Sequence, residues 1–495
     1  MSDRVLALDI GTQSTRAAVV AADGTILGIA QAKHEIESPS PGWAQQDPES
    51  WWDEAVRVVR MALEQTRTDP GALAAIAACG QMHGPVGVDR DGRVTTPRVQ
   101  LWCDKRCGEQ ASALQKRPDA SRLAALAGSM PNPAWTGIKV RWIRDREPAA
   151  YDRARWFLVP KDFINYRLTG VAATDPSEAS GSFLWDADAD RYTEALAEAV
   201  GVDLAKFAPA FPSHAVVGKV TPEAARATGL VAGTPVVAGG GDFPVSMLGF
   251  GIVGPGMTAD VTGTSLLLAA HTPKPLRDPS LQNLRHVVDG WIPFTILDCG
   301  GLSMTWCKDL ASSMTGREVS YDELVAMAEQ APPGSDGLLF YPYMLGERRS
   351  ENVAARGGFI GLKLGHAAPH LVRAVMEGVA LATGKDLDRL RRLGHAVRRI
   401  RSVGGGARNR LWNRIKADVF RVPVEIAEEP EAGIKGAALL AAAGAGLVTD
   451  PAAAAVARRA AGSVVEPDPG AAEVYGAAQA EFNRVYERLL GFWPA

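Results

Sequence analysis

A polar segment between two apolar runs carries the first residues whose chemistry suggests a ligand. The runs are Val5 to Leu8 and Ala17 to Ala22. A tight turn between them would direct backbone N–H groups, hydroxyls and a guanidinium at one point, where they could bind phosphate oxygens, although an ordinary polar turn is the alternative. Asp9 could hold Mg²⁺, directly or through water, because hard cations prefer carboxylate oxygens. The residues of this predicted phosphate loop are Asp9, Gly11, Thr12, Gln13, Ser14, Thr15 and Arg16.

Two glycine-containing turns in the second half of the chain have a similar character. Gly263-Thr264-Ser265 interrupts a predicted strand pair, and two such loops facing each other could grip one triphosphate. Gly404-Gly405-Gly406 follows a predicted strand, precedes a predicted helix and is followed closely by Asn409. Glycines there let a flat ligand or a phosphate approach the backbone closely, although a tight strand–helix turn without a ligand would also need them.

A single carboxylate is the candidate catalytic base. Asp242 comes after three glycines at the end of a predicted strand, Val236 to Ala238. A carboxylate displayed there can take a proton from a substrate hydroxyl, and it could also cap the helix that follows. Asp260 is the nearest competitor, but it lies inside a predicted strand and is expected to pair locally.

A third group of residues suits a sugar or polyol. The segment Gln81-Met82-His83-Gly84 follows a predicted strand and offers an amide and an imidazole for hydrogen bonds. Trp102 could supply an apolar wall and Asp104 an acceptor, although core packing explains the tryptophan equally well. Together these residues predict a binding site for a small polyhydroxylated molecule.

Two nucleotide-binding motifs of other folds are absent or out of context. Gly249 to Gly254 fits the dinucleotide pattern G-x-G-x-x-G, which would suit a nicotinamide-dependent dehydrogenase. The residues before it look like the start of a helix rather than a buried strand, and Pro255 interrupts any helix after it. The chain contains no GxxxxGK[ST] sequence, which argues against a P-loop enzyme.

The elements that must position these residues form two similar series. The first series opens with a predicted hairpin around Gly11, and the second with a hairpin around Gly263; each then alternates strands and helices. Asp47-Pro48 is typical of a helix start, with the aspartate as cap. The sequence therefore predicts two related α/β domains, residues 1–244 and 245–495.

Composition places the chain among ordinary globular proteins. It has 495 residues, 46% of them hydrophobic, and a formal net charge of −3, so no basic excess indicates a nucleic-acid or membrane-surface partner. The longest apolar stretch, Gly436 to Val448, is too short to span a bilayer. Five cysteines without a CxxC pair, and an N-terminus unlike a signal peptide, predict reduced thiols in a cytoplasmic protein.

Taken together, the motifs resemble the FGGY family of carbohydrate kinases over nearly the whole chain. The turns at Asp9 and Gly263 resemble the two phosphate loops of the family, and Gly404 to Asn409 resembles its adenosine-binding segment. The most specific match begins with Gly357-x-Phe359-x-Gly361-Leu362 and continues, after seven residues, with His370-Leu371-x-x-Ala374-Val375-Met376-Glu377.

The resemblance implies two actin/hexokinase-like (ribonuclease H-like) domains around a central cleft, with ATP and Mg²⁺ as cofactors and Asp242 as the catalytic aspartate. Gln81 to Gly84 resembles the sugar loop of xylulose kinases, which implies phosphorylation of D-xylulose. Phe243 departs from the amide usual after that aspartate, so a kinase for ribulose, erythritol or gluconate is the alternative. An actin-like protein that binds nucleotide without catalysis is a further alternative, and a homodimer is possible.

Overall fold

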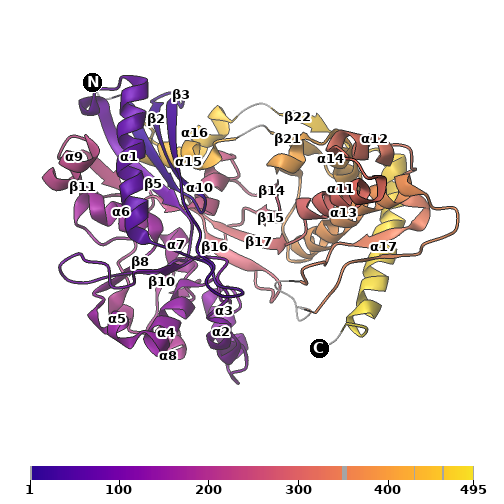
Figure 1. The fold of residues 1–495 in the computed structure, drawn as a ribbon, viewed down its shortest axis with the longest axis horizontal. Coiled ribbons are helices and arrows are strands. Elements are labelled where there is room, and N and C mark those ends of the chain that lie inside the picture. Colours follow the sequence, from indigo (N-terminus) through magenta and orange to yellow (C-terminus); the bar gives the residue numbers. More distant parts are fainter. Residues whose placement is uncertain (1–2, 348–353, 428–429, 460–461, 494–495) are drawn as a thin grey trace.

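The chain folds around two β-sheets that lie side by side, each with helices packed on it (Figure 1). The computed structural model describes residues 3–347, 354–427, 430–459 and 462–493. The N-terminal half forms one end of the molecule, and most of the C-terminal half forms the other. Each sheet has seven strands.

The first sheet has the strand order β11-β12-β5-β1-β2-β3, with β13 also paired to β5. The predicted hairpin around Gly11 is confirmed as the antiparallel pair β1–β2, which β3 extends. On its other side, β1 pairs in parallel with β5. Alternate side chains of β1 face opposite ways, so Leu6 and Leu8 enter one core while Val5 and Ala7 enter another. The strands are β1 (Arg4–Ile10), β2 (Ser14–Ala21), β3 (Ile26–Lys33), β5 (Leu73–Gly80), β11 (Val216–Lys219), β12 (Pro235–Val237) and β13 (Gly240–Gly241).

The second sheet repeats this arrangement in the order β16-β17-β15-β14-β20-β21-β22. β14 pairs antiparallel with β15 and parallel with β20, just as β1 pairs with β2 and β5. The predicted repeat of two α/β units is therefore confirmed at the level of strand direction. The strands are β14 (Met257–Thr262), β15 (Leu266–Ala270), β16 (Gln282–Arg285), β17 (Trp291–Leu297), β20 (Arg399–Val403), β21 (Val424–Ile426) and β22 (Ser463–Val465).

One face of the first sheet is covered by helices from its own half of the chain. The helix α1 (Pro48–Thr66) begins where the sequence predicts, because the Asp47 carboxylate accepts the backbone N–H of Glu49 at 2.9 Å. Its apolar side, which includes Trp51 and Val59, packs against Leu8 and neighbouring strand residues. The helices α6 (Pro160–Thr169) and α9 (Pro222–Thr228) contribute to the same core.

The opposite face of the first sheet is covered by a helix from the far end of the chain. The helix α15 (Ala432–Gly444) packs on β1 and β5 together with α10 (Asp242–Gly249). Figure 1 shows α15, in yellow-orange, beside the indigo strands. The boundary predicted near residue 244 falls inside α10, and α15 returns to the first sheet from well beyond it.

The second sheet also separates two cores. On one side, Leu266 and Leu268 pack with the helices α11 (Gly301–Thr315), α13 (Ala368–Arg392) and α14 (Arg410–Phe420). On the other side, Ala259 and Phe294 share a core with Met82 and Met247 of the first half. Each sheet thus buries one face against residues from the other half of the chain.

Shorter elements complete the fold. The remaining helices are α2 (Gly108–Gln115), α3 (Ala120–Ala127), α4 (Thr136–Arg146), α5 (Pro148–Arg153), α7 (Pro176–Ser180), α8 (Glu194–Val200), α12 (Tyr321–Ala328), α16 (Pro451–Arg458) and α17 (Pro469–Leu490). The remaining strands are β4 (Gln45–Gln46), β6 (Val86–Val88), β7 (Val99–Gln100), β8 (Trp156–Leu158), β9 (Trp185–Asp186), β10 (Arg191–Tyr192), β18 (Leu339–Tyr341) and β19 (Gly358–Ile360). Among the described residues, no helix is both long and apolar enough to cross a membrane.

The crossing of α10 and α15 depends on two glycines. A Cβ atom on Gly249 would lie 2.0 Å from the Ala432 carbonyl oxygen, and one on Gly436 would lie 2.1 Å from the Val245 carbonyl oxygen. Backbone atoms cannot move aside as a flexible side chain can, so the two helices approach this closely only because both positions lack a side chain.

We predict that Gly436→Ala lowers the free energy of unfolding by about 1–3 kcal/mol, the usual cost of overpacking a buried contact. Urea unfolding followed by circular dichroism measures the change. Gly108→Ala is the control, because a Cβ at that helix position meets no atom within 4 Å; it should be neutral or slightly stabilising. Equal stability of the two variants would contradict the prediction.

Candidate active site

The first predicted phosphate loop forms the turn between β1 and β2. The Gly11 N–H donates to the Ser14 carbonyl at 3.0 Å and closes the hairpin. Asp9, at the end of β1, is buried and accepts a hydrogen bond from the Arg16 guanidinium. The same guanidinium pairs with the Glu431 carboxylate at 2.6 Å, next to the start of α15. Arg16 therefore links the loop to the distant helix in addition to offering charge near the turn.

The hydroxyl groups of this loop contact two different parts of the fold: Trp102 on one side, and β3 with the residue after it on the other. The Thr12 hydroxyl accepts the Trp102 indole N–H at 3.1 Å, so the predicted aromatic wall contacts the phosphate loop directly. The Thr15 hydroxyl is buried and bonded to the His34 ring at 2.8 Å, and Ser14 Oγ accepts the amide of Gln31. The side chain of Thr15, one of the predicted phosphate-loop residues, joins β2 to the residue that follows β3.

A residue that the sequence analysis missed connects the phosphate loop with the sugar loop. The Gln46 side-chain amide donates to the Thr12 carbonyl at 2.8 Å and accepts from the Gln81 amide at 2.9 Å. The Trp51 indole donates to the same Gln46 oxygen. Gln46 lies on the short strand β4, where no motif marks it, so only the fold reveals this link.

The second phosphate loop opens onto a pocket of about 700 Å³. The predicted residues Gly263, Thr264, Gly405, Gly406 and Asn409 all line it. The other side of the pocket lies outside the predicted residues. It is formed by α11, α12, α14 and residues next to them: Gly301, Met304, Thr305, Tyr321, Asp322, Val325, Glu329, Arg408, Arg410, Leu411 and Trp412. The double glycine Gly300-Gly301, three residues after β17 and at the start of α11, is the sequence signal for it. A pocket of this size, with apolar walls and a glycine-rich edge, suits a nucleotide.

Close backbone packing explains the glycine run that borders this pocket. Gly404 has φ of 87°, and a Cβ there would lie 2.6 Å from the Thr262 carbonyl oxygen. A Cβ on Gly406 would lie 2.5 Å from the Thr262 side chain, whereas one on Gly405 would meet nothing within 4 Å. The Asn409 side chain caps α14 by accepting the N–H of Trp412. The segment from Gly404 to Asn409 thus forms both the turn between β20 and α14 and the open edge of the pocket.

Asp242 is the first residue of α10, directly after β13, and it is partly buried. Its carboxylate accepts the N–H of Phe243 at 2.7 Å. Burial, reinforced by the negative charge of Asp9, raises the pKa of Asp242 to about 7, and the Phe243 N–H opposes this shift only in part. A carboxylate with such a pKa is suited to accept a proton near neutral pH.

The pair Asp9 and Asp242 fits Mg²⁺ binding. The negative charge of Asp9 raises the pKa of Asp242, so the two carboxylates lie close enough to repel each other. A divalent cation near both would relieve this repulsion. The described residues contain no cluster of three or more His, Cys, Asp or Glu side chains placed to hold a metal. Mg²⁺ often needs no such cluster, because it is commonly held by one or two carboxylates together with substrate phosphates and water.

A buried ionic network that the sequence analysis missed holds the segment before Asp242. Lys161 is fully buried, and its ammonium lies 2.6 Å from the Asp162 carboxylate and 2.9 Å from that of Asp175. It also donates to the Ala238 carbonyl at 3.0 Å. Burial alone would lower the pKa of Lys161, but the two carboxylates outweigh burial and raise it. The adjacent Lys161 and Asp162, in the first turn of α6 shortly after the apolar strand β8, are the sequence signal for it.

The other oxygen of Asp175 extends this network to β13, the strand before Asp242. It accepts the Ser213 hydroxyl at 2.8 Å and the Ser177 N–H at 3.0 Å. The Ser177 hydroxyl in turn accepts the N–H of Gly241 at 3.0 Å. Asp242 therefore follows a backbone that is fixed by buried charges and hydroxyls.

The predicted sugar loop packs closely against this strand. His83 has φ of 75°, an uncommon value for a residue with a side chain, and its ring makes an edge contact with Trp135 at 5.1 Å. A Cβ on Gly241 would lie 2.7 Å from the Met82 sulfur, so Met82 covers the residue before Asp242. Phe243 turns its ring toward Phe294 of the second half, 5.0 Å away, where it packs partly buried.

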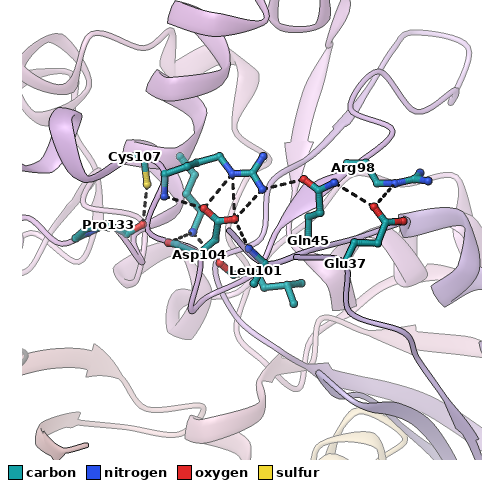
Figure 2. Close-up of polar contacts among 10 residues, drawn as sticks. Glu37, Gln45, Arg98, Leu101, Asp104, Cys107 and Pro133 are labelled. Atoms are coloured by element: carbon teal, nitrogen blue, oxygen red, sulfur yellow. Dashed lines mark hydrogen bonds and ion pairs between the residues drawn. The ribbon is translucent and has the colours of Figure 1, made fainter. Parts of the chain in front are cut away.

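Asp104 occupies a different environment from the one expected of a sugar ligand. Its buried carboxylate accepts the Ala44 N–H at 2.7 Å and several bonds from the Arg106 guanidinium. Figure 2 shows Asp104 within a polar network that extends through Gln45 to Glu37 and Arg98. Both oxygens are engaged, so this geometry favours a role in holding the loop over direct contact with a sugar.

Two further sequence interpretations can be compared with the structure. Asp260 pairs with the Lys416 ammonium at 2.5 Å and with Thr262 on its own strand, and it is fully buried, as expected for a structural carboxylate. The residues before Gly249 form the helix α10 rather than a strand, so the dinucleotide motif lacks its required context. Gly249 instead lets α10 approach α15.

Comparison with known proteins identifies the family. Models of the FGGY family of carbohydrate kinases match residues 4–249 (N-terminal domain) and 259–445 (C-terminal domain). The chain belongs to this family. The xylulose kinase of Escherichia coli (strain K12) is 30% identical over 418 residues, which cover 84% of each protein. That of Bacillus subtilis (strain 168) is 28% identical over 446 residues, 89% of this chain and 88% of the relative.

Solved structures agree with the fold of this FGGY kinase. The crystal structure of xylulose kinase from Rhodospirillum rubrum has a TM-score of 0.92 and 33% identity, covering 99% of both chains. Gluconate kinase from Lactobacillus acidophilus has the same TM-score at 22% identity over 99% of both chains, which supports the fold alone. The predicted fold of two actin/hexokinase-like domains is confirmed.

We predict that Lys161→Met lowers the free energy of unfolding by about 3–5 kcal/mol, because it leaves two buried carboxylates without their cation. Urea unfolding monitored by tryptophan fluorescence measures this change. Lys219→Met, which removes an exposed lysine at the end of β11, is the control and should change stability little. A Lys161→Met protein as stable as this control would contradict the proposed importance of the network.

Proposed function

We propose that this FGGY kinase transfers the γ-phosphoryl group of ATP to a terminal hydroxyl of a small sugar, with D-xylulose as the expected substrate. The observation that carries the proposal is the placement of Asp242, whose pKa is about 7, beside Asp9 and after a rigidly held strand. The nucleotide-sized pocket at Gly263 and Gly405 supports the assignment of ATP.

In this mechanism Asp242 is the general base. The sugar hydroxyl oxygen attacks the γ-phosphorus, its proton passes to the Asp242 carboxylate, and the bond from the γ-phosphorus to the bridging oxygen breaks to release ADP. Phosphoryl transfer depends mainly on positioning and charge stabilisation. Backbone N–H groups and hydroxyls of the two hairpin turns would contact the phosphates, and Gln46 would keep the first turn in register with the sugar loop.

Asp9 is the residue proposed to hold Mg²⁺, directly or through water. When bound, the ion would neutralise the charge that develops on the phosphates. Arg16 is ion-paired with Asp9 and Glu431, so it would hold the Asp9 carboxylate in place. This arrangement connects the metal-binding residue to the start of α15.

The sugar is assigned from the relatives and from the loop Gln81 to Gly84. Phe243 favours the alternative of another ketose, a polyol or a sugar acid, because its ring supplies no hydrogen bond and packs on Phe294. A nucleotide-binding protein without catalysis is disfavoured by the position of Asp242, which follows the strand end covered by Met82 of the sugar loop and lies near Asp9 of the phosphate loop. We infer a cytoplasmic location from the small, odd number of cysteines and from the lack of a CxxC pair in the sequence.

We predict that Asp242→Asn lowers kcat by roughly 10²–10⁴, the range expected for loss of a general base. Because Asp242 does not line the nucleotide pocket, the Kd for ATP should be unchanged when measured by calorimetry. The exposed residue Asp53 provides the control variant Asp53→Asn, which should retain full activity. Near-normal kcat in Asp242→Asn would remove this residue from the mechanism.

The same assay identifies the sugar. ADP release with Mg²⁺ and ATP is measured for D-xylulose, L-xylulose, D-ribulose, L-ribulose, D-gluconate, erythritol and glycerol. D-xylulose should give the highest kcat/KM. A higher value for another compound would keep the mechanism but reassign the substrate, and no turnover with any of them would favour the protein without catalysis.

The raised pKa of Asp242 also predicts the pH dependence of the reaction. Below a pH of about 7 the carboxylate is protonated and cannot accept the proton of the hydroxyl. kcat/KM for the sugar should therefore fall about tenfold per pH unit on the acid side, because this ratio reports groups of the free enzyme. Steady-state rates between pH 5 and 9 provide the measurement. A flat profile down to pH 5 would show that Asp242 is not the titrating base.

A further inference from the structure

A small cavity lies behind the catalytic strand, separate from the nucleotide pocket. Its volume is about 20 Å³, enough for one water-sized atom. Its polar lining comes from the helices α4, α6 and α7 and from nearby loops, and its apolar lining includes Phe157 and Phe207. The polar lining residues are Thr136, Asp162, Thr174, Glu178, Ser182 and Tyr192.

Two polar side chains that line this cavity lack protein partners. Glu178 is 2% exposed, and neither of its carboxylate oxygens has a hydrogen-bond partner among the described residues. The Thr136 hydroxyl is 3% exposed and is likewise without a partner there. A buried polar group without a partner is costly, so the cavity is expected to contain something that binds these oxygens.

The charges around the cavity favour a cation. Lys161 is the positive member of a buried cluster whose negative members are Asp162, Asp175 and Glu178, which leaves a formal excess of two negative charges. Burial raises the pKa of Glu178 well above its ordinary value and that of Asp162 to about 6. Either protons or a bound cation must reduce this excess.

The donors that face the cavity are all oxygens. Carboxylates and hydroxyls are the ligands of hard cations. Two carboxylates, those of Asp162 and Glu178, line the cavity, and Lys161 already pairs with the first. With Asp162 already paired, Glu178 is the carboxylate that lines the cavity without a hydrogen-bond partner among the described residues, so a monovalent ion matches the available charge better than a divalent one.

We propose that this cavity is a binding site for one monovalent cation, Na⁺ or K⁺, held by Glu178 together with the surrounding hydroxyl oxygens. The site is distinct from the Mg²⁺ and nucleotide sites, and it does not depend on the identity of the sugar. Glu178 follows Ser177, whose hydroxyl accepts the N–H of Gly241. A cation at Glu178 would therefore stabilise α7 and, through it, the strand that leads to Asp242.

The first test is thermal unfolding of the purified protein in NaCl, KCl, RbCl and choline chloride at equal ionic strength. Choline is too large for the cavity. We expect the melting temperature to be higher by about 2 °C or more in at least one alkali chloride than in choline chloride, because a ligand that binds only the folded state stabilises it. Equal melting temperatures in all four salts would overturn the proposal.

Matched variants localise the effect. Glu178→Gln keeps the shape of the side chain but removes its charge, and it should lose the difference between alkali and choline salts. Glu223→Gln removes an exposed carboxylate on α9 and should keep that difference. The same salt dependence in Glu178→Gln as in the parent protein would place the cation elsewhere and overturn the proposal.

A crystallographic test needs no variant and so covers the case in which Glu178→Gln fails to fold. Crystals of the parent protein grown in the alkali chloride that stabilises it should show density between Glu178 and Thr136 with the short contacts of a cation. For RbCl the peak should also scatter anomalously. Density of a water molecule hydrogen-bonded to a protonated Glu178 in every salt would overturn the proposal.

Discussion

Lys161 is a fully buried cation, and the placement of the proposed catalytic base depends on how its charge is compensated. Two buried carboxylates pair with it. The second oxygen of one of them, Asp175, accepts hydrogen bonds from the Ser213 hydroxyl and the Ser177 N–H. Ser177 then fixes the backbone of Gly241, the residue before Asp242. An unpaired charge in this position would be strongly destabilising, so the network has little freedom to rearrange. The end of β13 is therefore held in place as well.

The same end of the first sheet also receives the start of α15. Burying one face of each sheet against the other half of the chain brings Asp9, Arg16 and Glu431 together, although 415 residues separate the last two. The Thr12 carbonyl of the predicted phosphate loop and the Gln81 amide of the predicted sugar loop are joined through the Gln46 side chain. The loops proposed to bind the two substrates are thus linked by hydrogen bonds and ion pairs of side chains.

The glycines of the chain serve two different purposes in this arrangement. Gly249 and Gly436 let helices approach, and no side chain could replace them there without displacing backbone. Gly405 faces open space at the nucleotide pocket, while its neighbours Gly404 and Gly406 pack on Thr262. The G-x-G-x-x-G pattern at Gly249 is thus explained by helix packing, whereas Gly405 lies at the open edge of the proposed nucleotide pocket.

The repeated strand pattern, the hairpin turns at Gly11 and Gly263 and the position of Asp242 after a strand could be predicted from the sequence, because turns, caps and alternating burial are local consequences of residue type. The sequence could not show that Asp104 and Thr15 bond to their own surroundings, that α11 and α12 complete the proposed nucleotide pocket, or that α15 covers the first sheet. These features arise from contacts between residues far apart in the chain. Only the tertiary structure brings Lys161, Asp175 and Glu178 together, because their effect depends on a shared burial that no local pattern encodes.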